Sequence, residues 1–240
     1  MESINDIKLT GLEVISRIVY DVYKALTIKR PLFPELVKDY EEYHKKPLLS
    51  PLALIRYKLV SVLIDDHSTV LDVGCGDGTF MSFISKTKNC YAEGIEISME
   101  AANKAIKQGF NVHIRDLDLE GINLDKKFDY IVLMEVVEHL KFPHKVLVEA
   151  TSMAKKGVIV TIPNSGYILW RLQMLRGYFP RQSFTHLHFW SIMDFKIFLE
   201  QIGLKPQCII TELDLIKTKI LRKMLNYLRN LIAYQAVFLI

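Results

Sequence analysis

The sequence has few cysteines and no long apolar run. Its 240 residues include three cysteines, at positions 75, 90 and 208. Such an odd and sparse set of thiols does not form a disulfide framework, so a reducing compartment is expected. The segment 1–6 lacks the basic and apolar regions of a signal peptide, and no stretch approaches the roughly 18 apolar residues of a membrane span. We therefore expect a cytoplasmic protein without a transmembrane segment.

Neither sign of charge is in large excess. Lys and Arg number 31 and Asp and Glu 27, which gives a net charge of +4. This balance is too mild to indicate nucleic acid, and we expect no such partner. Hydrophobic residues make up 50% of the chain and charged residues 24%, as in ordinary globular proteins. The length predicts one large domain, or one domain with additions.

The strongest chemical signal lies in residues 70–78, where an apolar run ends in Asp72 and glycines occupy positions 74, 76 and 78. Residues 69–73 are typical of a strand buried on both faces. The glycines let the chain turn sharply and let a ligand approach bare backbone. A helix is expected from Thr79, with its first N–H groups pointing at the loop. Because position 79 is not glycine, the dinucleotide fingerprint G-x-G-x-x-G does not fit; a tight turn without ligand is the other alternative.

Further apolar segments continue an alternation of strands and helices. Helices are expected at 98–108 and 143–157, and strands at 90–95, 111–115, 128–134 and 158–162. Successive βα units predict a doubly wound parallel α/β sheet, with a ligand at the carboxyl ends of the strands. Glu96 ends the second strand, 20 residues after Gly76, where a carboxylate can accept hydrogen bonds from both hydroxyls of a ribose.

An N-terminal extension, residues 1–45, lies outside this core. Residues 6–26 have the apolar spacing of a helix, and residues 35–44 predict a short polar helix. The extension is open to interpretation as a lid, a dimer contact, a substrate wall or a helix that covers the core. Ser50 and Pro51 predict the N-cap and first turn of a helix that covers the sheet to about residue 64.

Two later segments each have two interpretations. Residues 166–180 are rich in large apolar groups, and they predict either an acceptor pocket or a packed helical hairpin. Residues 215–231 combine apolar groups at helical spacing with basic side chains elsewhere on the helix. This pattern favours a helix that faces the core, with contact to a membrane surface or a partner as the alternative. Between the two segments, Ser191 and Asp194 predict a capping box.

The glycine loop, D-x-G-x-G-x-G from Asp72 to Gly78, resembles motif I of the class I S-adenosylmethionine (SAM) methyltransferases. Residues 128–131, Phe-Asp-Tyr-Ile, resemble the fourth-strand motif of the same family, and the likeness covers about residues 50–240. The resemblance implies a Rossmann-like sheet of seven strands, with the sixth and the antiparallel seventh at 207–212 and 234–240. It implies a methyltransferase domain at 46–240, with an acceptor-side insertion at 163–190.

The resemblance also implies a set of residues around SAM. In the family, the glycine loop wraps the methionine half, Glu96 binds the ribose, and Asp116 accepts from the adenine amino group with Leu117 near the ring. Asp118 is a competing candidate for the adenine, and either acid could instead serve a turn. The implied cofactor residues are Asp72, Gly74, Cys75, Gly76, Gly78, Glu96, Ile97, Asp116, Leu117, Met134 and Glu135.

Two closer resemblances point to different functions. Residues 115–118 and 163–179 look like MetW proteins, which implies a SAM-binding partner or regulatory protein that need not be a catalyst. The run Glu135-x-x-Glu138-His139 is instead similar to ubiquinone-pathway O-methyltransferases and small-RNA 2′-O-methyltransferases. In members of both groups such residues bind a divalent metal, and the set here could hold Mg²⁺ or Zn²⁺. In the RNA enzymes a histidine four residues before a Trp completes the site, and His186 lies four residues before Trp190. The alternative is that Glu138 and His139 form hydrogen bonds at a helix start.

The sequence therefore predicts a SAM-dependent methyltransferase with a small-molecule acceptor. His139, His186 and His188 are candidate catalytic bases because imidazole titrates near neutral pH. The fourth strand ends in Met-Glu-Val-Val rather than the N-P-P-Y type of run found in amino-group methyltransferases, which favours an oxygen acceptor.

Overall fold

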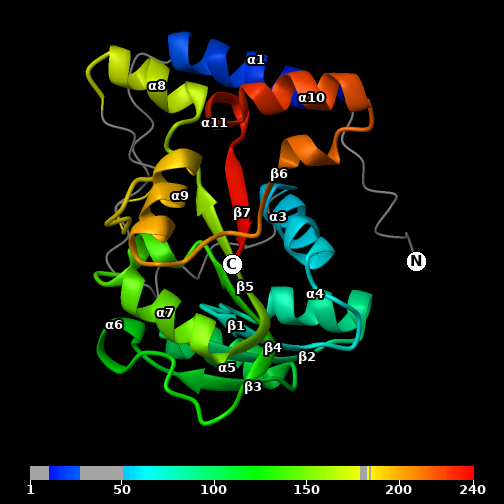
Figure 1. The fold of residues 1–240 in the computed structure, drawn as a ribbon, viewed down its shortest axis with the longest axis vertical. Coiled ribbons are helices and arrows are strands. Elements are labelled where there is room, and N and C mark those ends of the chain that lie inside the picture. Colours follow the sequence, from blue (N-terminus) through cyan, green and yellow to red (C-terminus); the bar gives the residue numbers. More distant parts are fainter. Residues whose placement is uncertain (1–10, 28–50, 179–182, 184) are drawn as a thin grey trace.

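The computed structural model describes residues 11–27, 51–178, 183 and 185–240 (Figure 1). A seven-stranded sheet runs through it in the order β3-β2-β1-β4-β5-β7-β6, and β7 is antiparallel to both of its neighbours. This confirms the expected α/β sheet with an antiparallel last strand. The strands are β1 Thr69–Val73, β2 Tyr91–Glu96, β3 Asn111–Ile114, β4 Phe128–Met134, β5 Ala154–Pro163, β6 Cys208–Thr211 and β7 Gln235–Leu239.

Helices cover both faces of the sheet. The helices are α1 Gly11–Thr27, α3 Pro51–Val62, α4 Thr79–Lys88, α5 Met99–Lys107, α6 Leu117–Glu120, α7 Pro143–Met153, α8 Ile168–Leu175, α9 Ile192–Gln201, α10 Lys219–Tyr227 and α11 Arg229–Ile232. Two 3-10 turns join them, η2 Val137–His139 and η3 Glu212–Leu215. None of the described helices is both long and apolar enough to cross a membrane.

Alternate residues of the central strands enter two hydrophobic cores. Val70 and Val132 pack under α3, α4 and α5, whereas Leu71 and Ile131 pack under α7 and α9. This alternation explains why β1 and β4 appear in the sequence as continuous apolar runs. The strand order reverses between β1 and β4, which opens a crevice at their carboxyl ends. The glycine loop follows β1 at this crevice.

Strand β5 begins four residues earlier than expected. The structure ends α7 at Met153 and starts β5 at Ala154, so Lys155 and Lys156 belong to the strand and do not close the helix. The register shifts between Phe128 and Tyr130 of β4, where β5 carries one extra residue. Both lysines are exposed at this irregularity, and Lys156 reaches Asp65 at 2.9 Å. Because these first residues of β5 are exposed and polar, an apolar run in the sequence does not mark where the strand begins.

Residues 215–231 do not form one helix that faces the core. The segment divides into the end of η3, helix α10 and helix α11, and no residue of α10 is buried. Leu221 and Leu225 pack against the core, whereas Ile220 and Met224, members of the expected inward stripe, are exposed. The apolar arc of α10 is wider than its contact with the protein.

The N-terminal extension and the insertion pack against each other. Helix α1 contacts α8, and the Arg17 guanidinium pairs at 2.7 Å with Glu212 of η3. Tyr167, before α8, is fully buried and donates a hydrogen bond at 2.6 Å to Asp21 of α1. The predicted helix at 35–44 and the predicted cap at Ser50 lie outside the described residues.

Candidate functional site

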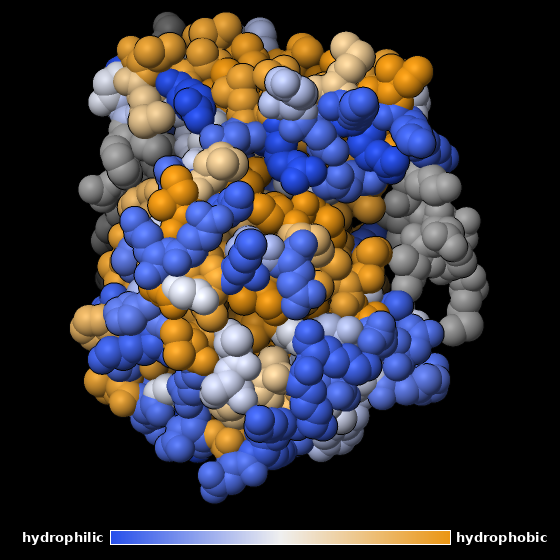
Figure 2. Space-filling view, in the orientation of Figure 1, coloured by the Kyte–Doolittle hydropathy of each residue, from blue (hydrophilic) through white to orange (hydrophobic). Residues whose placement is uncertain are grey.

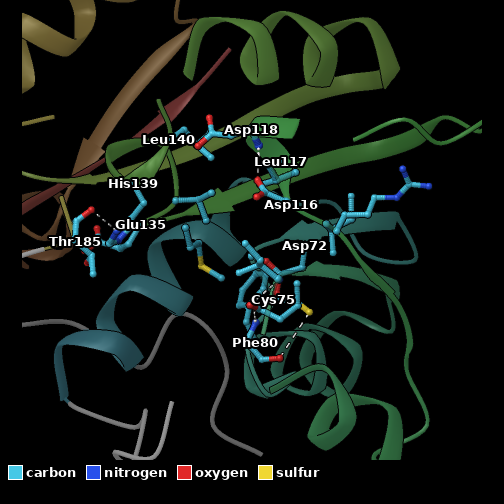
Figure 3. Close-up of a pocket in the computed structure, with 18 of the residues that line it drawn as sticks. Asp72, Cys75, Phe80, Asp116, Leu117, Asp118, Glu135, His139, Leu140 and Thr185 are labelled. Carbon is cyan, nitrogen blue, oxygen red and sulfur yellow. Dashed lines mark hydrogen bonds between the residues drawn. The ribbon is translucent and has the colours of Figure 1, made fainter. Parts of the chain in front are cut away.

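A cavity of about 510 Å³ opens at the carboxyl ends of β1, β2 and β4 (Figure 3). Ten of the eleven predicted cofactor residues line it: Asp72, Gly74, Cys75, Gly76, Glu96, Ile97, Asp116, Leu117, Met134 and Glu135. The eleventh, Gly78, does not. Of the three histidines proposed as bases, His139 alone lines the cavity. Among the described residues of 163–190, Thr185 and Leu187 line this cavity, and residues 166–178 do not.

The glycine loop depends on conformations and contacts that a side chain would disturb. Gly74 has φ +77°, and a Cβ at this position would overlap Cγ2 of Val136. Cys75 packs its sulfur against Gly94 of β2, so the loop lies between β2 and the residue that precedes η2. Gly78 has φ +84°, and its Cβ would lie 2.9 Å from that of Ala105. Gly78 therefore brings α4 and α5 together and does not face the cavity.

Asp72 is a buried carboxyl without a hydrogen-bond partner among the described residues. Only 1% of it is exposed, and both oxygens lack a partner there. Burial, and then the charge of Glu96, raises the pKa of Asp72 to about 8. The adjacent Tyr57 hydroxyl has its pKa raised to about 12 by burial and by the charge of Asp72. A cationic group in the cavity would satisfy this carboxylate.

Glu96 organises the end of β2. One of its oxygens accepts from the Gly76 amide at 2.8 Å, and the other accepts from Ile97 and Ser98, each at 2.8 Å. These contacts fix the carboxylate against the glycine loop. Glu96 also lines the cavity, where a carboxylate can act as a hydrogen-bond acceptor.

The two acids after β3 have different partners. Asp118 accepts hydrogen bonds from the amides of Lys141 and Phe142, at 2.9 and 3.2 Å, and so fixes the loop after η2. Asp116 caps α6 by accepting from the Asp118 amide at 2.9 Å. Both line the cavity, and each also performs the turn function that the sequence left open.

Glu135 has a strained backbone at the end of β4. Its φ of 55° places a non-glycine residue in the left-handed region, which is common at functional sites. Its carboxylate pairs with Arg56 at 3.1 Å, and Arg56 also donates to the Gln235 side chain at 2.9 Å. Burial raises the pKa of Glu135, while Arg56 opposes that shift. The ion pair connects α3, β4 and β7 across the cavity wall.

A cluster of Glu138, His139 and His186 lies beside the cavity. One ligand atom from each residue falls within 4.8 Å of the others. Both Glu138 oxygens and His186 Nδ1 are buried without a hydrogen-bond partner among the described residues. Burial, then the neighbouring Glu135, raises the pKa of Glu138. Burial, then His139, lowers the pKa of His186 to about 3.

The histidines differ in their surroundings. The carbonyl of Thr185 can only accept, so His139 Nδ1 donates to it at 3.2 Å and Nε2 carries the lone pair (Figure 3). His186 lies edge-on to His139, with ring centroids 4.7 Å apart. His188 donates from Nε2 to the Leu140 carbonyl at 2.9 Å and stacks on Trp190. His188 therefore anchors the loop outside the cavity.

Several cavity residues have no prominent sequence signal. Helix α3 supplies Arg56 and Tyr57, and loops supply Arg115, Lys141 and Leu187. Arg56 interrupts the apolar pattern of α3, which is a weak sign of a role other than packing. Leu187 and Thr185 come from a loop far along the chain, and only the fold brings them to the cavity.

Curated relatives match parts of the chain. Over 84 residues it is 37% identical to the probable (S)-tetrahydroprotoberberine N-methyltransferase 2 of Papaver bracteatum, covering 32% of this chain and 24% of that protein. Over 134 residues it is 29% identical to a ubiquinone biosynthesis O-methyltransferase of Coxiella burnetii, covering 52% and 56%. The chain thus spans between a quarter and somewhat over half the length of these two relatives.

Solved structures share the fold. A SAM-dependent methyltransferase from Archaeoglobus fulgidus aligns with a TM-score of 0.58 and 20% identity over 84% of this chain and 99% of that chain. One from Aquifex aeolicus aligns with a TM-score of 0.56 and 20% identity over 84% and 98%. These matches confirm the expected methyltransferase fold.

A family model matches most of the chain. The model described as methionine biosynthesis protein MetW matches residues 55–240. The matched region contains the glycine loop, Glu96, the end of β4 and every strand of the sheet. The chain therefore belongs to the MetW family.

Proposed function

We propose that the protein transfers a methyl group from SAM to a small-molecule acceptor. The observation that carries this proposal is the pair of buried carboxylates, Asp72 and Glu96, beside the glycine loop in the cavity. SAM presents an ammonium group, a sulfonium and a ribose with two hydroxyls. In this proposal Asp72 faces the cationic end of SAM, and Glu96 accepts from the ribose.

The remaining predicted residues complete this arrangement. The backbone of Gly74, Cys75 and Gly76 would follow the methionine part of SAM, and Asp116 with Leu117 would adjoin the adenine. Ile97, Met134 and Glu135 would form the walls. All of these residues line the same cavity, which supports their assignment to one ligand.

We further propose that the acceptor atom is oxygen. The S–CH₃ bond breaks as an O–CH₃ bond forms, and the hydroxyl proton passes to a base. His139 is the candidate base because its Nε2 carries a lone pair and burial lowers its pKa, so the ring is neutral at pH 7. His186 and His188 would position it. The relatives named for O- and N-methyl transfer leave nitrogen as the competing acceptor.

Methyl transfer can be measured with methyl-labelled SAM and a set of phenols, alcohols and amines. We expect transfer to a hydroxyl compound. His139→Gln should slow it by roughly 10²-fold or more while SAM affinity is kept, because general-base catalysis contributes about 10²–10⁴. Transfer to amines alone would contradict the oxygen assignment.

Membership of the MetW family favours a second candidate function. The protein would bind SAM and regulate a partner enzyme without transferring the methyl group. Tight SAM binding, with no transfer to any acceptor in the set above, would favour this candidate over catalysis.

A divalent metal fits the cluster beside the cavity. Both Glu138 oxygens lack a hydrogen-bond partner among the described residues, with Oε1 4.0 Å from His186 Nε2, and His186 is neutral, so both residues can donate to a cation. One carboxylate and two imidazoles suit Zn²⁺ better than Mg²⁺, which prefers oxygen ligands. Glu135 pairs with Arg56 and lies outside the three-residue group. As an alternative to a base role for His139, we propose that Glu138, His139 and His186 hold such an ion. Nε2 of His139 would then be a ligand, and the ion would lower the pKa of an acceptor hydroxyl.

Metal binding can be tested without an acceptor. Calorimetric titration of the purified chain with Zn²⁺, and separately with Mg²⁺, should give a heat of binding to one site. Glu138→Gln should abolish this heat, whereas Glu200→Gln, on the exposed face of α9, should leave it unchanged. Absence of binding, or equal binding by both variants, would remove the metal from the proposal.

A further inference from the structure

One end of the molecule carries an exposed apolar surface that the cavity does not use. Helices α1, α8 and α10 lie along this end (Figure 1), and Figure 2 shows hydrophobic residues across it. Its most exposed members include Leu12 at 79%, Leu175 at 85%, Ile220 at 76% and Tyr227 at 95%. We call these residues, with Val19 and Tyr23 of α1, the end face.

The end face arises because two helices have apolar arcs wider than their contact with the protein. In α1, Ile18 packs against the core while Leu12 and Val19 point outward. In α10, Leu221 and Leu225 pack inward while Ile220 and Met224 are exposed. A helix that meets only water on its outer side normally carries polar residues there.

Contacts with the body hold the end face in place. Arg17 of α1 pairs with the fully buried Glu212, and Asp21 accepts from the buried Tyr167 hydroxyl. Arg17 and Asp21 both lie on the inner side of α1, which faces the protein. The helix is therefore oriented so that its outer apolar residues face away from the protein.

Two of the segments that form the end face are basic, whereas α1 holds two acids, Glu13 and Asp21, and two bases, Arg17 and Lys24. Segments 166–178 and 215–231, which contain α8 and α10, hold seven Lys and Arg residues and no Asp or Glu: Arg171, Arg176, Lys217, Lys219, Arg222, Lys223 and Arg229. Lys217, Lys219 and Lys223 are exposed, and within the described ranges they form no salt bridge. This excess lies beside the apolar surface, although the whole chain carries a net charge of only +4.

We propose that the end face binds a lipid bilayer containing anionic headgroups, with α1 and α10 lying in the membrane interface. Apolar residues beside lysines are the pattern of an interfacial helix. Tyr23 and Tyr227 have the amphipathic rings that are enriched at the headgroup level. A second copy of this chain fits less well, because an isologous contact would bring the same lysines together.

Vesicle sedimentation of the full chain tests this proposal. We expect binding to vesicles in which about a third of the lipid is phosphatidylglycerol, weaker binding to pure phosphatidylcholine, and partial release by high salt. Lys223→Glu and Ile220→Glu should each weaken binding about tenfold. Lys107→Glu and Ile106→Glu, which alter an exposed lysine and an exposed apolar residue of α5, should leave it unchanged.

Circular dichroism and SAM binding identify any variant that fails to fold. No binding to the anionic vesicles, or equal losses in the α10 and α5 variants, would overturn the proposal. Sedimentation velocity tests whether a second copy of the chain occupies the end face instead. If the protein does not bind vesicles but forms a dimer that Ile220→Glu dissociates, the end face is a dimer contact. Vesicle binding does not depend on methyl transfer, so failure of either proposal leaves the other intact.

Discussion

Asp72 is an acid of the cavity whose pKa the fold raises toward neutral pH. Its pKa of about 8 in the folded chain exceeds the value of about 3.9 expected when unfolded. The folded state therefore binds more protons between these values, and the contribution of Asp72 to stability falls as pH rises from about 4 to 8. The SAM-free protein carries a destabilising carboxyl that a cationic ligand would relieve.

Asp72→Asn should stabilise the SAM-free protein more at pH 8 than at pH 5. The amide stays neutral, so the variant avoids the loss described above. We expect a gain on the order of a few kcal/mol at pH 8, or several degrees in Tm, from about 1.4 kcal/mol for each pKa unit. Thermal unfolding at both pH values measures it. A difference in Tm that is the same at pH 5 and pH 8 would argue against the raised pKa.

Substitution of Gly74 tests how closely the glycine loop must approach Val136, which follows β4. Gly74→Ala would place a methyl group on Val136 and force an unfavourable φ of +77°. Gly203→Ala is a matched control because Gly203 has φ +80° and open space around it. We expect both variants to lose about 1 kcal/mol of stability from the backbone, and only Gly74→Ala to lose tenfold or more in SAM affinity. Equal affinities in the two variants would show that the contact with Val136 is unimportant.

The sequence indicates some residues of the site and not others. Asp72 and Glu96 each stand at the end of an apolar strand, so the strand pattern alone predicts that they meet at one edge of the sheet. Arg56 comes from a helix before the core, and no local pattern says that its side chain reaches Glu135. Gly78 resembles the other loop glycines in sequence, yet it serves the packing of α4 on α5. Position along the chain does not reveal which side of the loop a glycine faces.

At the scale of elements, α3 is part of the cavity wall as well as a cover for the sheet. Arg56→Met removes the cation that pairs with Glu135. The pKa of Glu135 should therefore rise further, and its carboxyl should stay protonated up to a higher pH. We expect SAM affinity to fall about tenfold, since the wall at β4 loses its support. Lys58→Met, on the same helix, is the control and should bind as the unchanged protein does. Calorimetry on both variants decides, and unchanged affinity in Arg56→Met would contradict this role for α3.

The prediction of elements succeeds where burial is complete and fails at surfaces. Strands β1 and β4 have the predicted bounds because most of their residues are apolar and buried. The sequence does not indicate the start of β5, because Lys155 and Lys156 are exposed there and the strand is irregular. For α10, helical spacing identifies an apolar arc but not which part of a wide arc meets the core. Only the position of neighbouring helices determines that choice.

At the scale of the whole molecule, the ion pair of Arg17 with Glu212 joins the N-terminal helix to the methyltransferase fold. Glu212 is fully buried, and Arg17 is its cationic partner. Arg17→Met should cost about 2 kcal/mol, less than a fully buried pair because Arg17 is partly exposed. The double variant Arg17→Met/Glu212→Gln should recover part of that loss. Urea unfolding measures the free energy of unfolding of each variant. A loss in the double variant that exceeds the sum of the two single losses would contradict the pairing.

The two functional regions lie on different parts of the fold. The cavity uses the carboxyl ends of β1, β2 and β4, whereas the end face uses helices outside the central α/β units. Strand β5 connects them, because it pairs with β4 and leads into α8.

The most direct test of the account is calorimetric titration with SAM at pH 7, in two buffers with different heats of ionisation. Asp72 is mostly protonated at this pH when SAM is absent, and a cationic ligand should ionise it. The account predicts that SAM binds with release of up to about one proton, and that Asp72→Asn binds more weakly without proton release. No binding, or binding by both proteins with the same affinity and no proton exchange, would contradict it.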